Sequence, residues 1–311
     1  MLAEERQRGH ALARTLACLT RADLAEVQLG LVRDCDPYPG VVFRDACERA
    51  TTALAGLLDA PHVDALLASH ALSALAWTHH PRAVELFSLW RRALPPWAGR
   101  LHISPDRYTH AGGWELSDDG TPRALAGEPC MELTASGSSE DARAMIASDQ
   151  HCRCGRPLTL LFGVRTAHIL LPWLGWPSDR LIVPMCDACV CFGTLFYSSS
   201  ESDTLVPIGE PQAVPEDAPT WPLLPKVGLA LGARRSPYRA ADWLLEMKES
   251  QVGGHPGWVQ DPAYPTCPSC RRTMCFVGQV AGSEVDRHRE GTYYGFACAP
   301  CGLVAANYQQ T

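Results

Sequence analysis

Cysteine clusters in the second half of the chain carry the clearest chemical signal. Of the 14 cysteines in 311 residues, ten fall in four tight groups. The last two groups are Cys267-Pro-Ser-Cys270 and Cys298-Ala-Pro-Cys301. Two Cys-x-x-Cys turns that meet present four thiolates in a tetrahedron, which fills the coordination sphere of a structural zinc ion. The spacing therefore predicts a zinc ribbon with these four ligands, whereas redox dithiols usually occur singly beside a helix start.

The two earlier groups predict a second, less regular site. They are His151-Cys152-Arg-Cys154 and Cys186-Asp-Ala-Cys189-Val-Cys191. We expect Cys152, Cys154, Cys186 and Cys189 to bind the second zinc ion, because a thiolate binds zinc well even from a tight turn. His151, at the regular spacing, and Cys191 are alternate ligands.

An internal repeat relates the two pairs of clusters. Residues 154–164 align with residues 270–280, and in both a cysteine turn runs into an apolar strand. Each half then returns to a second turn and a further strand, at 192–197 or 303–308. A duplicated zinc ribbon in a β-rich domain, residues 151–311, is the economical interpretation. Further strands are predicted at 158–164, 181–183, 276–280 and 291–297.

The N-terminal part has a different periodicity. Between residues 12 and 90, apolar residues recur at intervals of three and four, which indicates amphipathic helices. Breaks at 36–40, 59–61 and 78–81 divide them into about four helices. Short connections favour antiparallel pairs, so we predict a HEAT-like helical array over residues 1–97. The fold class is α+β.

Three segments fall outside the predicted helical array and strands. Residues 98–150 are rich in turn residues and predict an irregular connection between the two domains. The proline-rich stretch 211–225 predicts an extended loop, and 240–249 predicts one short helix.

Charge and hydropathy limit the compartment and the partners. The formal net charge is -7 and the isoelectric point is about 5.9, so a basic protein partner is favoured and nucleic acid is not expected. No window is apolar enough for a membrane span or a secretory signal. We expect a cytoplasmic protein, in which paired cysteines bind metal rather than form disulfides.

Several segments resemble a known family. The stretch QVGGHPGWVQ, from Gln251 to Gln260, precedes Cys267-Pro-Ser-Cys270, and the run CGRPL begins at Cys154. With the closing residues YQQT, they resemble the programmed cell death protein 2 family, and more closely a bacterial domain-of-unknown-function family related to it. The resemblance covers roughly residues 150–311, with a departure at His151, where the family has a cysteine.

The resemblance implies a β-rich, two-part domain without established catalysis. Eukaryotic members of the family act as chaperones for a ribosomal protein, and some bacterial relatives are candidate immunity proteins in toxin systems. By this resemblance, a partner is either a toxin or a nascent client. The N-terminal helices are not part of the eukaryotic pattern.

These observations favour a binding protein over an enzyme. Eight thiolates would saturate two zinc ions and leave no open position for a catalytic water. None of the 11 histidines forms a zincin motif. We therefore expect a non-enzymatic zinc-binding protein that recognises a basic protein, as an immunity protein or a chaperone.

Two alternatives remain, together with two readings of one tryptophan. Pairs such as Arg234-Arg235 and Arg271-Arg272 would give a nucleic-acid-binding zinc ribbon a basic edge, and a metal-dependent hydrolase is the second alternative. Trp258 is expected either to pack on the sheet after a glycine turn or to line a partner groove with Gln260.

Overall fold

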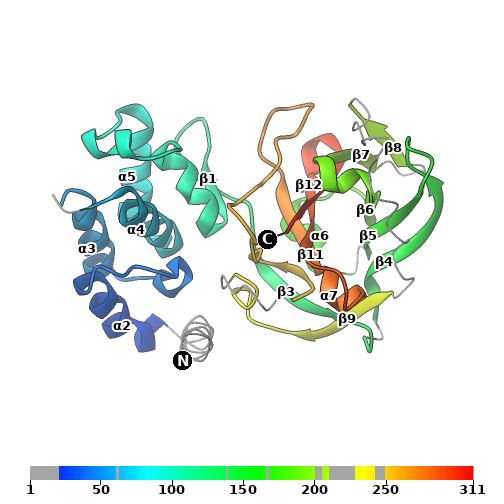
Figure 1. Cartoon of the computed structure of the whole chain (residues 1–311), viewed down its shortest axis with the longest axis horizontal. Helices are drawn as coiled ribbons and strands as arrows, with labels where there is room; N and C mark the ends of the chain where they lie inside the picture. The colour runs from blue at the N-terminus through cyan, green and yellow to red at the C-terminus, as the bar shows by residue number, and fades with distance from the viewer. Residues whose placement is uncertain are drawn as a thin grey trace. The chain divides into compact units, whose positions relative to one another are not determined.

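The chain folds into two compact units that divide at Leu125 and Ala126. The computed structural model describes residues 21–60, 63–137, 139–165, 168–199, 205–209, 228–241 and 249–310. The first unit is mainly helical, and the second is built on a large, nearly closed antiparallel sheet (Figure 1). The predicted α+β class is therefore confirmed. No helix in these ranges is long and apolar enough to cross a membrane.

Short helices with defined ends form the first unit. Within the described ranges they are α2 (Arg21–Arg33), η1 (Gly40–Phe43), α3 (Glu48–Leu58), α4 (Ala65–Thr78), α5 (Pro81–Arg92), η2 (Pro96–Arg100) and η3 (Pro105–Gly112). Asp64 caps α4 by accepting a hydrogen bond of 2.8 Å from the backbone N–H of Leu67, and Pro81 starts α5. The three predicted breaks lie between these helices, but the structure does not confirm a HEAT-like array.

The helical unit continues beyond the predicted end at residue 97. A hairpin of β1 (Trp114–Leu116) and β2 (Pro122–Ala124) follows η3. The indole of Trp114 is buried among the helices and donates a hydrogen bond of 2.8 Å to the carbonyl of Ala76. Burial of this large aromatic side chain ties residues 98–125 to the helical core.

Eleven strands form the sheet of the second unit. They are β3 (Gly127–Thr134), β4 (Ser139–His151), β5 (Pro157–Arg165), β6 (Arg180–Met185), β7 (Leu195–Ser199), β8 (Leu205–Ile208), β9 (Leu229–Arg234), β10 (Gln251–Gly254), β11 (Cys275–Ala281), β12 (Thr292–Cys298) and β13 (Leu303–Gln309). Their order is β6-β5-β4-β9-β3-β10-β11-β12-β13-β7-β8. Two short helices, α6 (Leu170–Leu174) and α7 (Gly282–Val285), and two 3-10 turns, η4 (Cys189–Phe192) and η5 (Ala299–Cys301), connect them.

The segment 98–150 is not the irregular connection that the sequence predicts. Its second part forms β3 and the long strand β4, both inside the sheet. The sequence of β4, SEDARAMIASDQH, has few β-branched residues, and its pairing is interrupted by register shifts. Met145 adopts a left-handed φ of 59° at one irregularity. The predicted loop 211–225, and residues 242–248 of the predicted helix, lie outside the described residues.

The repeat is visible in the sheet, except that one strand, β7, pairs outside its own half. The antiparallel pairs β5–β6 and β11–β12 are each flanked by two cysteine turns. In the second half, β13 pairs with β12; in the first half, the equivalent strand β7 leaves β6 and pairs with β13. The first ribbon therefore contributes its third strand to the sheet of the second.

The core of the second unit lies between the two halves of the sheet. Phe162 on β5 is fully buried, and its ring lies against the backbone of Gly278 and Gly295 on β11 and β12. The absence of side chains at these glycines makes room for the ring. The strands contribute further apolar residues to this core, among them Val183 and Val304.

Candidate metal centres

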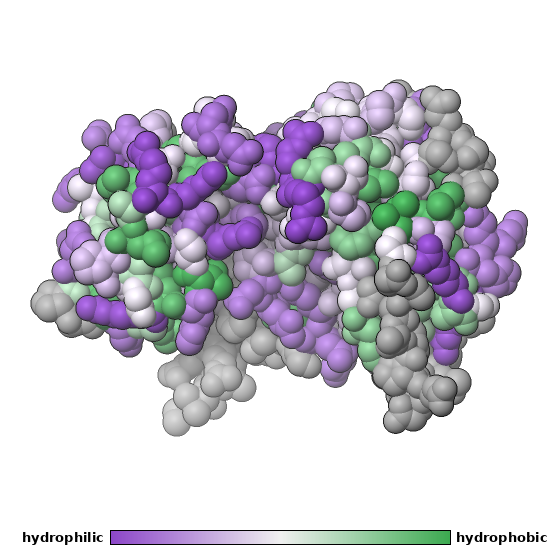
Figure 2. Space-filling view, turned by 90° about the horizontal axis from the view of Figure 1, so that it is seen from above, coloured by the Kyte–Doolittle hydropathy of each residue, from purple (hydrophilic) through white to green (hydrophobic). Residues whose placement is uncertain are grey.

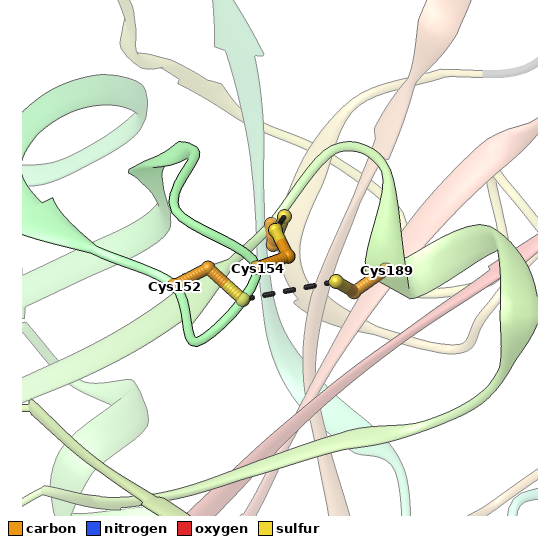
Figure 3. A group of neighbouring side chains, drawn as sticks. Cys152, Cys154 and Cys189 are labelled. Atoms are coloured by element: carbon orange, nitrogen blue, oxygen red, sulfur yellow. Dashed lines mark hydrogen bonds between the residues drawn. The ribbon is translucent and has the colours of Figure 1, made fainter. Parts of the chain in front are cut away.

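Four cysteines meet at one end of the pair β5–β6. Cys152 and Cys154 lie in the turn between β4 and β5, while Cys186 and Cys189 follow β6. All four sulfur atoms lie within 4.8 Å of one another, with 3.7 Å between Cys152 and Cys189 and 3.5 Å between Cys154 and Cys186. Figure 3 shows the side chains of Cys152 and Cys154, from one turn, converging with that of Cys189 from another. We call these four residues the first cluster.

An equivalent group lies at the end of β11–β12. Cys267 and Cys270 precede β11, Cys298 is the last residue of β12, and Cys301 ends the 3-10 turn η5 that follows. Their sulfur atoms also lie within 4.8 Å of one another, with 3.6 Å between Cys270 and Cys298. We call them the second cluster.

The sulfur separations match a shared metal ion and not disulfides. Four ligands at a zinc–sulfur distance of about 2.3 Å in a tetrahedron stand about 3.8 Å apart, whereas a disulfide requires about 2.05 Å. The measured separations of 3.5, 3.6 and 3.7 Å are close to the tetrahedral value. All eight cysteines are free thiols. Each cluster can therefore hold one metal ion.

The turns share a backbone conformation that directs the thiols inward. The residue after the second cysteine is left-handed in three of the four turns, with φ of 85° at Gly155, 62° at Arg271 and 62° at Gly302. Hydrogen bonds close the turns, for example from Cys267 N–H to the Arg272 carbonyl at 2.8 Å. Arginine takes the left-handed conformation at a cost that glycine avoids, so the turn geometry is imposed at Arg271.

Hydrogen bonds between the thiols favour partial ionisation of each cluster. The bond with the Cys186 thiol lowers the pKa of Cys152 to about 4 and raises that of Cys186. In the second cluster burial raises the pKa of Cys270, but hydrogen bonds from the Arg272 backbone and guanidinium and from neighbouring thiols outweigh it and bring the pKa to about 6. Burial raises the pKa of Cys298. Four adjacent thiolates repel one another, so a bound cation is what allows all of them to ionise together.

Arginines beside the turns were not predicted as part of either site. Arg156 forms an ion pair of 3.5 Å with the buried carboxylate of Asp187, which stands between two cysteines of the first cluster. The Arg272 guanidinium donates a hydrogen bond to Cys270 in the second. A site of four thiolates and one divalent cation has a net charge of -2, which these cations offset. Their only sequence signal is their place next to cysteines.

The alternate ligands of the first cluster lie outside it. Cys152 is among the four grouped sulfur atoms, whereas His151 and Cys191 are not, and both are exposed. The thiol of Cys191 donates instead to the carbonyl of Asp187 at 3.4 Å. Cys275 likewise lies on β11, outside the second cluster.

Trp258 packs on the sheet, and Gln260 is exposed beside it. The ring of Trp258 lies 4.8 Å from that of Tyr294 and 5.0 Å from that of Tyr264, measured between centroids. Gln260 donates to the carbonyl of Gln310 at 2.8 Å. The structure thus places Trp258 in the packing role that the glycine turn favours.

Buried glutamines hold the segment that carries Trp258. Gln309 accepts hydrogen bonds of 3.1 Å from the N–H groups of Val259 and Gln260, and Gln279 accepts one of 2.7 Å from Gly257. The side-chain amides replace the backbone partners that a neighbouring strand would supply. Neither glutamine carries a sequence pattern that distinguishes it from a surface residue.

Comparison with known proteins yields a relative but no family. The chain is 37% identical over 254 residues to "Uncharacterized protein YpfL" of Salmonella typhimurium, with 77% of this chain and 58% of the relative covered. The chain thus matches little more than half of that relative's length. No family model matches the chain, and the resemblance to the programmed cell death protein 2 family stays a prediction. No solved structure matches it either.

Proposed function

We propose that each cluster binds one structural zinc ion and that the protein works by recognising a protein partner. The two groups of four converging thiols are the observation that carries this proposal. Soft thiolate ligands in a tetrahedral arrangement favour zinc over magnesium, calcium or manganese. Structural zinc contributes on the order of 10 kcal/mol to folding, which is as large as the stability of a typical domain.

Saturated coordination supports a non-catalytic role. A catalytic zinc ion keeps one position for water, whereas four thiolates occupy all positions. Among the residues that the structure describes, the only groups of three or more metal-binding side chains are these two clusters. The hydrolase alternative therefore has no candidate site in those ranges.

Ion pairing weakens the nucleic-acid alternative. Arg234 pairs with Glu128 at 3.1 Å, and Arg235 pairs with Glu249 at 2.7 Å, so this part of the predicted basic edge is neutralised. The net charge of -7 adds to the barrier against phosphate backbones. The same charge favours a basic protein, such as a toxin or a nascent client.

The helical unit offers apolar side chains for such a partner. Leu66, Leu89, Leu94 and Ile103 are 63%, 50%, 66% and 51% exposed. Figure 2 shows apolar residues lying among hydrophilic ones on one face of this unit. Partner interfaces combine such apolar contacts with a polar rim.

Metal analysis tests the first half of the proposal, and recovery of a partner tests the second. The purified protein should contain two equivalents of zinc, and one or none would overturn the assignment. Tagged protein in native host extract should recover one basic protein repeatedly, and the variant Leu66→Asp, Leu94→Asp should recover less. Equal recovery of the partner by the variant would argue against binding through the exposed apolar side chains of the helical unit. Salt-sensitive recovery of RNA in place of a protein would favour the nucleic-acid alternative.

A further inference from the structure

Strand β8 is an edge strand whose outer side is closed by side chains. Within the described residues β8 pairs with β7 alone. On its outer side, the N–H of Leu205 donates to the Gln150 side-chain carbonyl at 2.8 Å. The Arg153 guanidinium donates to the carbonyl of Pro207 at 3.0 Å and also to that of Gly209. These bonds occupy the backbone groups that a further strand would otherwise use.

The residues that close this edge lie in or next to the first metal cluster's turn: Arg153 is in the turn, and Gln150 is near the end of β4. Arg153 stands between Cys152 and Cys154, and Gln150 is two residues before Cys152. The turn is held by a hydrogen bond of 2.8 Å from the Cys152 N–H to the Arg156 carbonyl. A metal ion bound by both cysteines would fix the backbone on each side of Arg153.

A fixed stem matters because Arg153 bridges two carbonyls. A guanidinium donates in a rigid planar fork, so both bonds form together only when the side chain starts from the right place. Arg153 is itself exposed, and its side chain would lose the bridge if the turn moved. The backbone position of β8 therefore depends on whether the turn that carries Cys152 and Cys154 is held in place.

We propose that the first cluster is a metal-dependent latch, in which bound metal holds Arg153 against β8 and metal loss opens this edge of the sheet. This inference rests on the proposed binding of metal at the first cluster. Opening would free the outer backbone groups of Leu205, Pro207 and Gly209. It would also loosen β8 where Leu205 is buried against the core and Val206 is 48% exposed.

Hydrogen–deuterium exchange with parallel metal analysis tests the latch on the full chain with zinc in excess. In Arg153→Gln, both zinc equivalents should remain, and the amides of Leu205, Val206, Ile208 and Gly209 should exchange about tenfold faster, equivalent to ~1.4 kcal/mol. In Cys154→Ser, one equivalent should be lost, and the same amides should exchange at least as fast as in Arg153→Gln. Arg165→Gln removes an exposed arginine at the end of β5 and should change neither quantity. Amides of β11 serve as an internal reference.

The outcomes separate the latch from the metal site. Unchanged exchange at 205–209 in Arg153→Gln overturns the latch, as does metal loss in Cys154→Ser without faster exchange there. If Cys154→Ser does not fold, Arg153→Gln alone decides, because it leaves all four thiols in place. Wild-type protein without zinc at the first cluster would instead overturn the proposed function, and the latch with it.

Discussion

The contact between Phe162 and Gly295 joins the two halves of the sheet, and its strength can be measured. A methyl group on Gly295 would lie 2.7 Å from the Cδ2 and Cε2 atoms of the Phe162 ring. The ring is fully buried and cannot swing into solvent. Gly295→Ala should therefore strain the core, and we expect a loss of about 1–3 kcal/mol in unfolding free energy.

Removing the Phe162 ring should make the added methyl group at residue 295 tolerable, because the ring is the group that this methyl group would meet. Phe162→Ala alone leaves a cavity and should cost about 3–5 kcal/mol. In the double variant the Gly295 methyl group has room and fills part of the cavity. The double variant should thus be more stable than the sum of the single effects predicts, by at least ~1 kcal/mol.

Urea-dependent hydrogen exchange, read on peptides of β5 and β12, gives the unfolding free energy of the second unit alone. Zinc must be in excess in every sample, so that metal occupancy is constant. Val304→Ala, at a buried position of β13, serves as a control. Its change in unfolding free energy should add to that of Gly295→Ala, because the added methyl group at residue 295 meets the Phe162 ring and not Val304. Additivity of Phe162→Ala and Gly295→Ala within about 0.5 kcal/mol would refute the packing described here.

Three further predictions concern the metal, the backbone and pH. Cys298→Ser should unfold the second unit at 37 °C and, because both clusters lie in that unit, lose both zinc equivalents; an unchanged melting curve would contradict a structural role. Gly253→Ala should lower the unfolding free energy measured in urea by at least ~2 kcal/mol, because φ is +70° and the new Cβ would meet the Pro129 carbonyl. As a control, Gly155→Asn, at an exposed position with open space around it, should cost less. Burial raises the pKa of Cys130 from about 9 to about 11, so its contribution to stability is complete below pH 9 and is lost as pH rises to 11. That loss, on the order of 2–3 kcal/mol, should disappear in Cys130→Ala, and an equally steep decline in this variant would exclude the thiol as its source.

The cysteine spacing predicts the grouping of thiols because short turns leave few ways to place them. Two residues between cysteines bring both sulfur atoms to one side of a turn, and the repeat puts two such turns at the same end of a strand pair. At the Cys-x-Cys turn the sequence offers two candidate ligands, Cys152 and His151, because His151 has the regular two-residue spacing to Cys154. The structure places Cys152 in the cluster and leaves His151 exposed on β4.

Strands β3 and β4 could not be predicted because their residues do not show the usual alternation. Ala142, Ala144 and Met145 of β4 are buried, but alanine is a poor strand former and the bulge at Met145 interrupts the two-residue period. Buried Gln279 and Gln309 were equally hidden, because a polar side chain predicts exposure unless its partners are known. Their partners belong to the segment around Trp258, 22 residues from Gln279 and 50 residues from Gln309 in sequence.

The pairing of β7 with β13 joins the two metal sites into one structure. β7 follows the second turn of the first cluster, and β13 follows the second turn of the second cluster. These strands pair with each other, and the N–H of Ser199 donates to the carbonyl of Gly302 at 3.0 Å, next to Cys301. Metal at the first cluster would therefore order β7, and metal at the second cluster would order β13. Because the two strands pair, each cluster depends on the strand that follows the other. Because binding and folding are linked in such sites, loss of one ion should weaken retention of the other, which two independent ribbons in series would not show.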